Sequence, residues 1–521
     1  MKKLVFLFAM VFVVGMAMAQ NTATTTQEGT SNSAATTQIG ALNDANVDQT
    51  GTSNFVTVLS QGNSNTAVAS QNGTQNGYAS RPDLGYIKQI GSSNQAFLRE
   101  GVVGVTTSNY ADGFIDQSGN GNYAELNISG EYHNFAEHGI TQIQIGEETP
   151  GNNAVITEAY YGNDMDVYQS GSGNDVTGEI NGSYSQFFVD QIGTGNTGLV
   201  YIEGSNNGEP SWWTKSSTLR ALNLLSQTGS DNDAEINQVG DNNTFVVTQE
   251  GTDNYAYSNQ LGNGNAASIV QQGSAVNYNH AEVEQYGDDN DAGIAQSADN
   301  NTAYIYQGWG LAPLWDSKNV LGSGNTASIA QSGGEFNFAG VWSLGDENEV
   351  IVSQNGSNNV ARLSNGYNYA NVNGVPELYP ASGNTITLTQ SGDNNWVRNF
   401  QLGDDNTLTL TQNGNGNTVG GRTPRWETLG DGRNARAEYF QQLGDGNTLV
   451  GTQNGNATLD AASIQDGDEN DILLTQGNGD WGLIIQDGDL NGATLTQYGG
   501  AQQGTILQTG DSNAATITQG N

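Results

Sequence analysis

One short pattern recurs along most of this chain: a glutamine, a glycine two positions later, an asparagine three positions after the glycine, and a second glutamine eleven residues after the first. Small or aliphatic residues occupy alternate positions between the asparagine and the next glutamine. Repetition at a short fixed period indicates a repeat architecture, so the length of 521 residues reflects a number of repeats rather than several globular domains. The pattern is clearest at Gln227, Gly229, Asn232, Gln238, Gly240, Asn243, Gln249, Gly251, Asn254, Gln260, Gly262 and Asn265, and again at Gln390, Gly392, Asn395, Gln401, Gly403, Asn406, Gln412, Gly414 and Asn417.

Each repeat predicts one strand and one connection. Alternation places Asn406, Leu408, Leu410 and Gln412 on one face of a strand and three threonines on the other. The glycine-rich segment that follows favours a sharp change of direction, because Gly and Asn tolerate left-handed conformations. One such unit cannot bury its apolar face alone, so two units face to face make a rung of about 22 residues, and rungs stack. We therefore predict an all-β fold, a two-sided β-solenoid with a cross-β spacing of ~4.8 Å.

The inward glutamines and asparagines specify the register of this stack. A buried amide without a partner destabilises the fold by ~1–3 kcal/mol. In an in-register stack, each amide can pair with the equivalent amide of the rungs above and below. A slip by one residue would turn every inward side chain outward. The repeat therefore predicts buried amide ladders at the ends of each strand, with glycines in the connections.

The chain divides into a secretory signal and one repeat domain. Residues 1–19 combine Lys2 and Lys3, an apolar stretch and a small-residue cleavage site, which is typical of a signal peptide too short to span a membrane. We predict that residues 20–521 form one solenoid and that the mature protein is exported and has no membrane span. Longer segments interrupt the repeat and are predicted to be loop insertions, near residues 77–88, 101–116, 127–143, 208–226, 308–319, 364–380 and 419–441.

Composition argues against several classes of function. The formal net charge of -40 disfavours nucleic acid as a partner, because binding a polyanion requires basic patches. With no cysteine, three histidines and no isolated catalytic motif, we expect neither an enzyme nor a cofactor nor a metal site. His133 and His138 lie near glutamates, but we interpret them as solvated residues of an irregular insertion rather than as metal ligands.

Acidic residues gather in the predicted connections, at Asp288, Asp289, Asp404, Asp405 and Asp445. Like charges ~5 Å apart in water repel each other by ~0.8 kcal/mol per pair. We therefore hypothesise that these residues are gatekeepers, which keep the chain soluble during export and oppose premature stacking.

Repeats begin directly after the predicted cleavage site and continue to Gln519. Solenoids that stay monomeric need capping units, and we expect no cap at either end. This expectation favours stacking of one copy on another.

The QxGxxN core with alternating small residues and a closing glutamine resembles the curlin repeat of curli subunits, the secreted building blocks of bacterial functional amyloid. The resemblance covers nearly the whole mature chain. It implies a homopolymeric extracellular fibre in the biofilm matrix, a curli-type outer-membrane secretion pore, and accessory or nucleator proteins as partners. By matching position, Gln227, Gly229, Asn232 and Gln238 would be the strand-end amides and turn glycine of one motif. We expect the chain to depart from the family in having many more repeats, large insertions and repeats that begin directly after the predicted cleavage site, without a leader.

Two other functions stay open. A monomeric cell-surface adhesin could be built from the same repeats. A binding rod is the second alternative, since Thr385, Thr387 and Thr389 with Thr407, Thr409 and Thr411 resemble the threonine arrays of ice-binding solenoids. Threonine is also simply a good outward strand residue.

Overall fold

A computed structural model describes residues 20–76, 85–101, 108–109, 113–129, 138–145, 150–160, 162–208, 223–273, 278–308, 322–370, 376–379, 381–420, 426–428, 434–436, 440–460 and 462–520. The chain forms two compact units, Met1–Gln249 and Glu250–Asn521. The predicted signal peptide, residues 1–19, lies outside the described residues.

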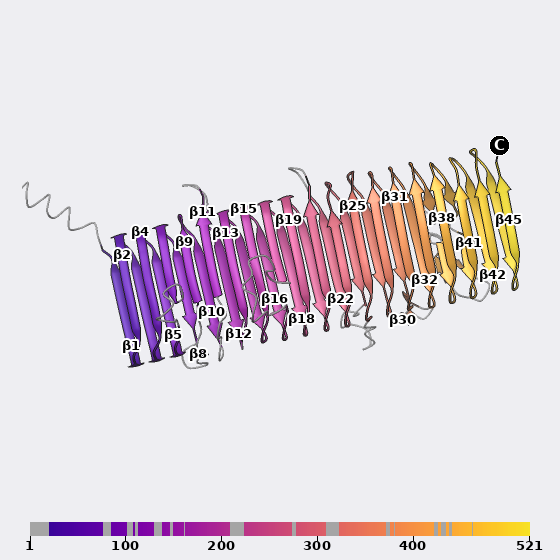
Figure 1. The fold of residues 1–521 in the computed structure, drawn as a ribbon. Helices are drawn as coiled ribbons and strands as arrows, with labels where there is room; N and C mark the ends of the chain where they lie inside the picture. Colours follow the sequence, from indigo (N-terminus) through magenta and orange to yellow (C-terminus); the bar gives the residue numbers. More distant parts are fainter. Residues whose placement is uncertain are drawn as a thin grey trace, which may run out of the picture. The chain divides into compact units, whose positions relative to one another are not determined.

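The first unit is a stack of strands that alternate along the chain between two parallel sheets, A and B (Figure 1). Sheet A contains β1 (Thr22–Thr30), β3 (Asp44–Thr52), β5 (Thr66–Thr74), β7 (Gln95–Glu100), β10 (Tyr123–Ser129), β12 (Asn153–Ala159), β14 (Asp175–Asn181), β16 (Thr197–Glu203) and β18 (Asp233–Val239), with the short β8 (Ser108–Asn109) beside β5. Sheet B contains β2 (Ser33–Ala41), β4 (Phe55–Asn63), β6 (Tyr86–Ser92), β9 (Gly113–Ser118), β11 (His138–Gln144), β13 (Asp164–Ser172), β15 (Gln186–Thr194), β17 (Asn223–Ser230) and β19 (Thr244–Thr252).

The second unit repeats this arrangement. Sheet A contains β20 (Tyr255–Leu261), β22 (His280–Tyr286), β24 (Thr302–Gln307), β26 (Phe338–Ser343), β28 (Val360–Asn365), β32 (Trp396–Leu402), β34 (Thr418–Val419), β37 (Phe440–Leu443), β39 (Thr458–Leu459), β40 (Ile464–Asp466), β42 (Trp481–Asp487) and β44 (Gln503–Thr509). Sheet B contains β21 (Ala266–Gln272), β23 (Asp291–Gln296), β25 (Thr326–Ser332), β27 (Glu349–Asn355), β31 (Thr385–Ser391), β33 (Thr407–Asn413), β38 (Thr448–Asn454), β41 (Asp471–Gln476), β43 (Gly492–Gln497) and β45 (Ala514–Gln519). Two antiparallel pairs lie outside the sheets, β29 (Tyr367–Ala370) with β30 (Pro376–Tyr379) and β35 (Trp426–Thr428) with β36 (Asn434–Arg436).

Register places equivalent residues of the repeat over one another. In sheet B of the second unit, Gln390 pairs with Gln412, and Gln412 pairs with Gln453 across the 419–441 insertion. The insertion therefore leaves the register of the stack unchanged. The predicted fold class, an all-β two-sided β-solenoid with parallel rungs, is confirmed in each unit.

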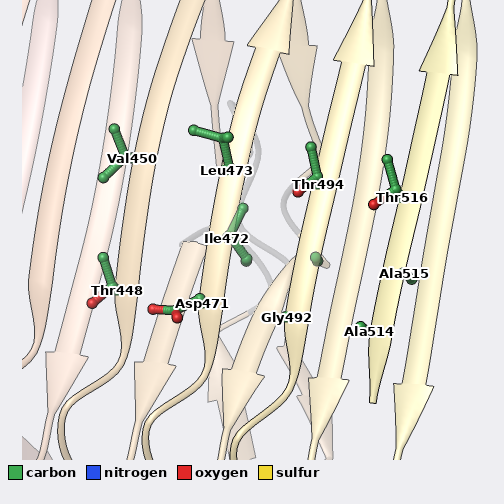
Figure 2. Close-up of a pocket in the computed structure, with 11 residues that line it drawn as sticks. Thr448, Val450, Asp471, Ile472, Leu473, Gly492, Thr494, Ala514, Ala515 and Thr516 are labelled. Atoms are coloured by element: carbon green, nitrogen blue, oxygen red, sulfur yellow. The ribbon is translucent and has the colours of Figure 1, made fainter. Parts of the chain in front are cut away.

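The core of each unit is a layer of alternate residues between the two sheets. In β33, Leu408, Leu410 and Gln412 are buried and the threonines between them are half-buried on the outer face. Val450, Leu473, Thr494 and Thr516 are outward residues of neighbouring strands of sheet B, β38, β41, β43 and β45 (Figure 2). The alternation in the sequence therefore corresponds to the inner and outer faces of each sheet.

Several insertions are shorter than predicted. Strands occupy part of the ranges 77–88, 101–116, 127–143, 208–226 and 419–441, because β6, β9, β11, β17 and β37 begin inside them and β10 ends inside the third. Range 364–380 contains the end of β28 and the β29–β30 pair, and range 308–319 lies almost wholly outside the described residues. Lys88 and Asp116, which lie inside two of these ranges, are outward neighbours in β6 and β9 and form an ion pair at 2.8 Å.

Candidate functional site: amide ladders and stacked turns

Glutamine side chains form a ladder in sheet B of each unit. In the second unit, Gln390 Nε2 donates to Gln412 Oε1 at 2.9 Å and Gln412 Nε2 donates to Gln453 Oε1 at 2.8 Å. In the first unit, Gln227 Nε2 donates to Gln249 Oε1 at 2.8 Å. These side chains are fully buried. Every rung of such a ladder thus supplies both a donor and an acceptor to its neighbours.

The same amides also join the two sheets. Gln412 Nε2 lies 3.3 Å from the carbonyl oxygen of Trp396 in sheet A, and Gln227 Nε2 lies 2.7 Å from that of Thr197. Gln249 Nε2 donates in the same way to the carbonyl oxygen of Asp233 at 2.9 Å. An amide therefore uses one hydrogen to continue the ladder and the other to hold the opposite sheet, which satisfies both donors in a dry environment.

Asparagines form a second set of buried ladders at the start of the strands. Asn395 Nδ2 donates to Asn359 Oδ1 at 3.0 Å, and Asn417 Nδ2 donates to Asn395 Oδ1 at 2.9 Å. The remaining asparagines of the predicted set are also buried, namely Asn232, Asn243, Asn254, Asn265 and Asn406. Asn265 and Asn406 donate to the carbonyl oxygen of a turn glycine one rung away. The predicted glycines Gly229, Gly240, Gly251, Gly262, Gly392, Gly403 and Gly414 all have positive φ angles.

Close stacking of the turns requires these glycines. A Cβ atom built on Gly403, whose φ is +105°, would lie 2.3 Å from the carbonyl oxygen of Gly444 in the next rung. Backbone approaches backbone at this point, so no side-chain movement could relieve the clash.

The ladder in sheet A is interrupted, which the regular eleven-residue spacing does not reveal. Gln260 Nε2 continues to Gln285 at 2.9 Å and Gln401 Nε2 continues to Gln442 at 2.6 Å. However, Gln401 Oε1 has no hydrogen-bond partner among the described residues, because Asn365 occupies the preceding ladder position and its amide is too short. Gln238 Oε1 accepts a hydrogen bond from Asn223 Nδ2 in sheet B at 3.0 Å.

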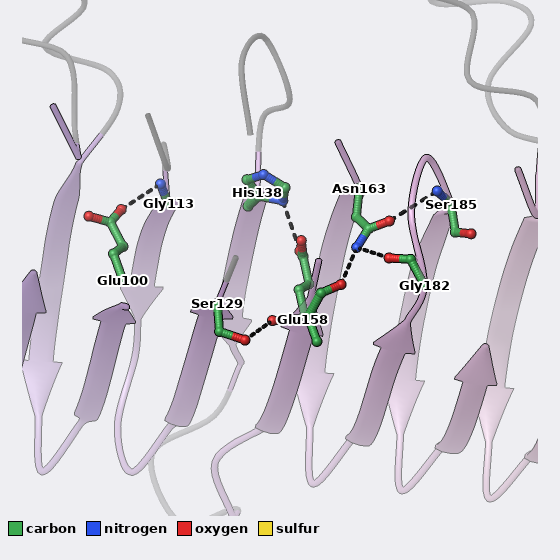
Figure 3. Close-up of polar contacts among 9 residues, drawn as sticks. Glu100, Gly113, Ser129, His138, Glu158, Asn163, Gly182 and Ser185 are labelled. Atoms are coloured by element: carbon green, nitrogen blue, oxygen red, sulfur yellow. Dashed lines mark hydrogen bonds and ion pairs between the residues drawn. The ribbon is translucent and has the colours of Figure 1, made fainter. Parts of the chain in front are cut away.

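Between β5 and β18 of the first unit, aliphatic and acidic residues replace the sheet A glutamines. The positions in register with Gln71 and Gln238 are Glu100, Ile128, Glu158, Ile180 and Ile202. Glu100 is fully buried and accepts hydrogen bonds from Gln71 Nε2 at 2.6 Å and from the Gly113 amide at 2.9 Å (Figure 3). The amide ladder therefore ends on a carboxylate whose two oxygens both have partners.

Glu158 makes a buried pair with His138. His138 Nδ1 in sheet B lies 2.8 Å from Glu158 Oε1 in sheet A, and both side chains are 0% exposed (Figure 3). Burial alone lowers the pKa of His138, but the charge and hydrogen bond of Glu158, with smaller effects of Asp164 and Asp166, raise that pKa to about 9. His138 is therefore protonated at neutral pH, and the pair joins the two sheets by an ion pair.

The interpretation of His138 as a solvated residue of an insertion is wrong. His138 is the first residue of β11, in register with Gly113 and Met165, and points into the core. His133 lies outside the described residues. A signal was present in the sequence, since Glu158 stands eleven residues before Gln169 at a ladder position and thus required a buried partner.

The acidic residues of the turns form a hydrogen-bonded column in the second unit. The Asp404 amide donates to Asp445 Oδ1 at 2.8 Å, and the Asp445 amide donates to Asp468 Oδ1 at 2.9 Å. Asp288 accepts from the Asn263 amide at 2.8 Å in the same manner. Asp289 and Asp405 occupy the next turn position, with φ angles of +56° and +58°. One oxygen of each stacked carboxylate is thus held by a neighbouring rung, while the charges remain aligned.

Among the described residues, no cluster of three or more His, Cys, Asp or Glu side chains could hold a metal ion. That part of the chain also contains no helix with the length and hydropathy needed to cross a membrane.

Comparison with known families identifies the repeat. A family model described as the curlin associated repeat matches residues 20–51, 240–273, 277–308, 382–414, 403–455 and 488–520. No curated protein matches the chain. Both the repeat family and the solenoid fold are structural rather than enzymatic. The matches show that this chain carries curlin associated repeats at six places along its length.

Proposed function

We propose that this protein is the structural subunit of an extracellular, curli-like amyloid fibre in which copies stack end to end. The observation that carries the proposal is the in-register glutamine ladder of sheet B, in which each amide donates to one rung and accepts from another. A ladder of this kind has a donor at one end and an acceptor at the other. A second copy with the same rung can therefore continue it, as in cross-β fibres.

The unpaired edges of the sheets also favour end-to-end stacking of copies. Each parallel strand exposes backbone donors and acceptors at an unpaired edge, and such edges template the addition of further strands. In the described residues the side chains of β1 are exposed along its whole length, and those of β45 alternate between exposed and half-buried. Side chains that are buried in interior rungs are thus accessible here, and a stacked copy would bury them.

The proposal includes the route to the cell surface. Residues 1–19 would direct export, and a curli-type outer-membrane pore would pass the chain to the exterior, where fibres would contribute to the biofilm matrix and adhesion. A nucleator protein is a further proposed partner. Aligned turn carboxylates such as Asp404 and Asp445 would oppose stacking, and we retain them as gatekeepers during export.

Fibre diffraction tests the proposal. Purified residues 20–521 should form unbranched fibres with a meridional reflection at ~4.8 Å. Replacing the ladder residues Gln169, Gln191 and Gln227 together by Ala should slow fibre growth at least about tenfold, because each substitution leaves buried amides without partners. The matched control replaces the outward residues that follow each glutamine, Ser170, Ile192 and Thr228, by Ala. This control should change the rate of fibre growth by less than about twofold.

A folded chain that stays monomeric at high concentration would contradict the fibre and support the adhesin. Equal slowing by the ladder variant and its control would show that the ladder does not direct stacking.

A further inference from the structure

The outer face of sheet B in the second unit is a regular array from β31 to β45, which we call the threonine face. Its columns run across six successive strands in register. The columns are Thr385, Thr407, Thr448, Asp471, Gly492 and Ala514; Thr387, Thr409, Val450, Leu473, Thr494 and Thr516; and Thr389, Thr411, Thr452, Thr475, Thr496 and Thr518. The last column contains only threonine.

The threonine face is almost uncharged. Asp471 is the one charged residue in the three columns, although the chain has a formal net charge of -40. Several acidic residues of this unit instead align in the turns, as in the column that contains Asp404, Asp445 and Asp468. Two copies that approach through this face therefore bring together surfaces that repel each other little.

The threonine face is not flat. Val450 and Leu473 project from it with 43% and 51% of their surface exposed. Beside them lies a shallow pocket of ≈ 330 Å³, which is lined by these residues and by the small residues Gly492, Ala514 and Thr494 (Figure 2). A Cβ atom built on Gly492 would meet nothing within 4 Å. An apolar projection and an unfilled hollow thus lie side by side.

We propose that the threonine face docks against the same face of a second copy, so that stacks pair side by side. A partner with the same rung spacing of ~4.8 Å matches the columns over all six strands, and another copy of this chain has that spacing. Identical columns interdigitate in the dry interfaces between cross-β sheets. Leu473 and Val450 of one copy would then reach into the furrows and the hollow of the other.

The area is sufficient for a specific contact. Six strands at ~4.8 Å spacing and about 20 Å of strand length give roughly 600 Å² per copy, or about 1,200 Å² in total. This value lies at the lower end of specific interfaces. In a fibre the contact repeats with every subunit, so the pairing of long stacks is much tighter than that of two single copies. The proposal rests on the proposed fibre for this increase in strength.

Two substitutions test the pairing without disturbing the stack. Gly492→Leu fills the hollow, and Leu473→Lys places a charge on the face. The matched control is Gly293→Leu in β23, which lies on the outer side of the same sheet but outside the threonine face, and where a Cβ atom also meets open space. We expect electron microscopy to show laterally paired filaments for the wild type and the control, and single filaments for both variants. The ~4.8 Å reflection should persist in all four.

Single filaments of the wild type, or paired filaments of Gly492→Leu and Leu473→Lys, would overturn the pairing. If the wild type forms no fibres, the proposed function fails, and sedimentation of the folded chain then decides the pairing. In that case the pairing is supported if the wild type and Gly293→Leu are dimers and the other two variants are monomers. The pairing is overturned if the wild type is a monomer. If that monomer also slows ice growth, the threonine face would be assigned to ice binding.

Discussion

Replacing one glutamine in the middle of the sheet B ladder provides the most direct test of the core. Gln412→Leu keeps a similar volume and removes the amide. Gln453 Oε1 then loses its donor at 2.8 Å, and Gln390 Nε2 loses its acceptor at 2.9 Å but keeps the carbonyl oxygen of Val360 at 3.2 Å. The link from Gln412 to Trp396 in sheet A also disappears.

The magnitude follows from these contacts. An orphaned buried carbonyl destabilises by ~1–3 kcal/mol, and each further lost hydrogen bond by about 1 kcal/mol. Burial of the leucine side chain offsets part of this loss. We expect a net destabilisation of about 2–4 kcal/mol in the rungs around β33, which corresponds to hydrogen exchange faster by a factor of about 30 to 1,000.

Native-state hydrogen exchange is the appropriate assay, because a long repeat array does not unfold in a single two-state transition. Peptides from β31, β33 and β38 should lose protection in Gln412→Leu, while the outward control Thr411→Leu should change them by less than about 0.5 kcal/mol. Increased protection in Gln412→Leu would refute the reasoning, because it would mean that apolar contacts stabilise this column better than amides.

Three further predictions concern the ion pair and the turns. The pKa of about 9 for folded His138 lies above the ordinary value of ~6.5, so its charge stabilises the first unit below about pH 6.5, and roughly 3 kcal/mol is lost as the pH rises to about 9. Hydrogen exchange of peptides from β11 and β12, corrected for the pH dependence of intrinsic exchange, should show this loss, and replacing both members of the pair, His138→Phe with Glu158→Leu, should abolish it. Gly403→Ala should destabilise its turn by several kcal/mol, whereas Gly492→Ala should be neutral or stabilising, and exchange in the flanking strands distinguishes them. Asp445→Asn removes a charge but keeps the acceptor for the Asp404 amide, so the fibrillation lag should shorten; an unchanged lag at low and high salt would count against gatekeeping.

Much of the fold could be predicted from local pattern. Alternation at residues 406–412 distinguishes inward from outward side chains without tertiary information, and the structure buries Leu408, Leu410 and Gln412 as that alternation requires. Insertion boundaries were harder to predict, because Lys88 and Asp116 are charged residues of a strand, and their pairing across 28 residues becomes visible only when β6 lies beside β9.

The candidate site, like the fold, could be predicted from the sequence only in part. Glutamines at regular spacing predicted ladders, but not where each ladder ends. In sheet A the ladder positions change from amides to Glu100, Ile128 and Glu158. The two buried carboxylates are stabilised by partners: the Gly113 amide donates to Glu100, and His138 pairs with Glu158. Both partners come from sheet B, so neither can be inferred from the column alone.

By itself, the sequence determined the period, the inner and outer faces, and the register marks, because these depend on spacing of two, eleven and about 22 residues along one chain. The tertiary structure alone decided which columns are continuous, which buried charges are paired, and where an uncharged face with an open hollow at Gly492 arises. These features depend on contacts between rungs separated by insertions of variable length and between sheets that face each other. Stacking in space, rather than distance along the chain, sets the environment of each side chain.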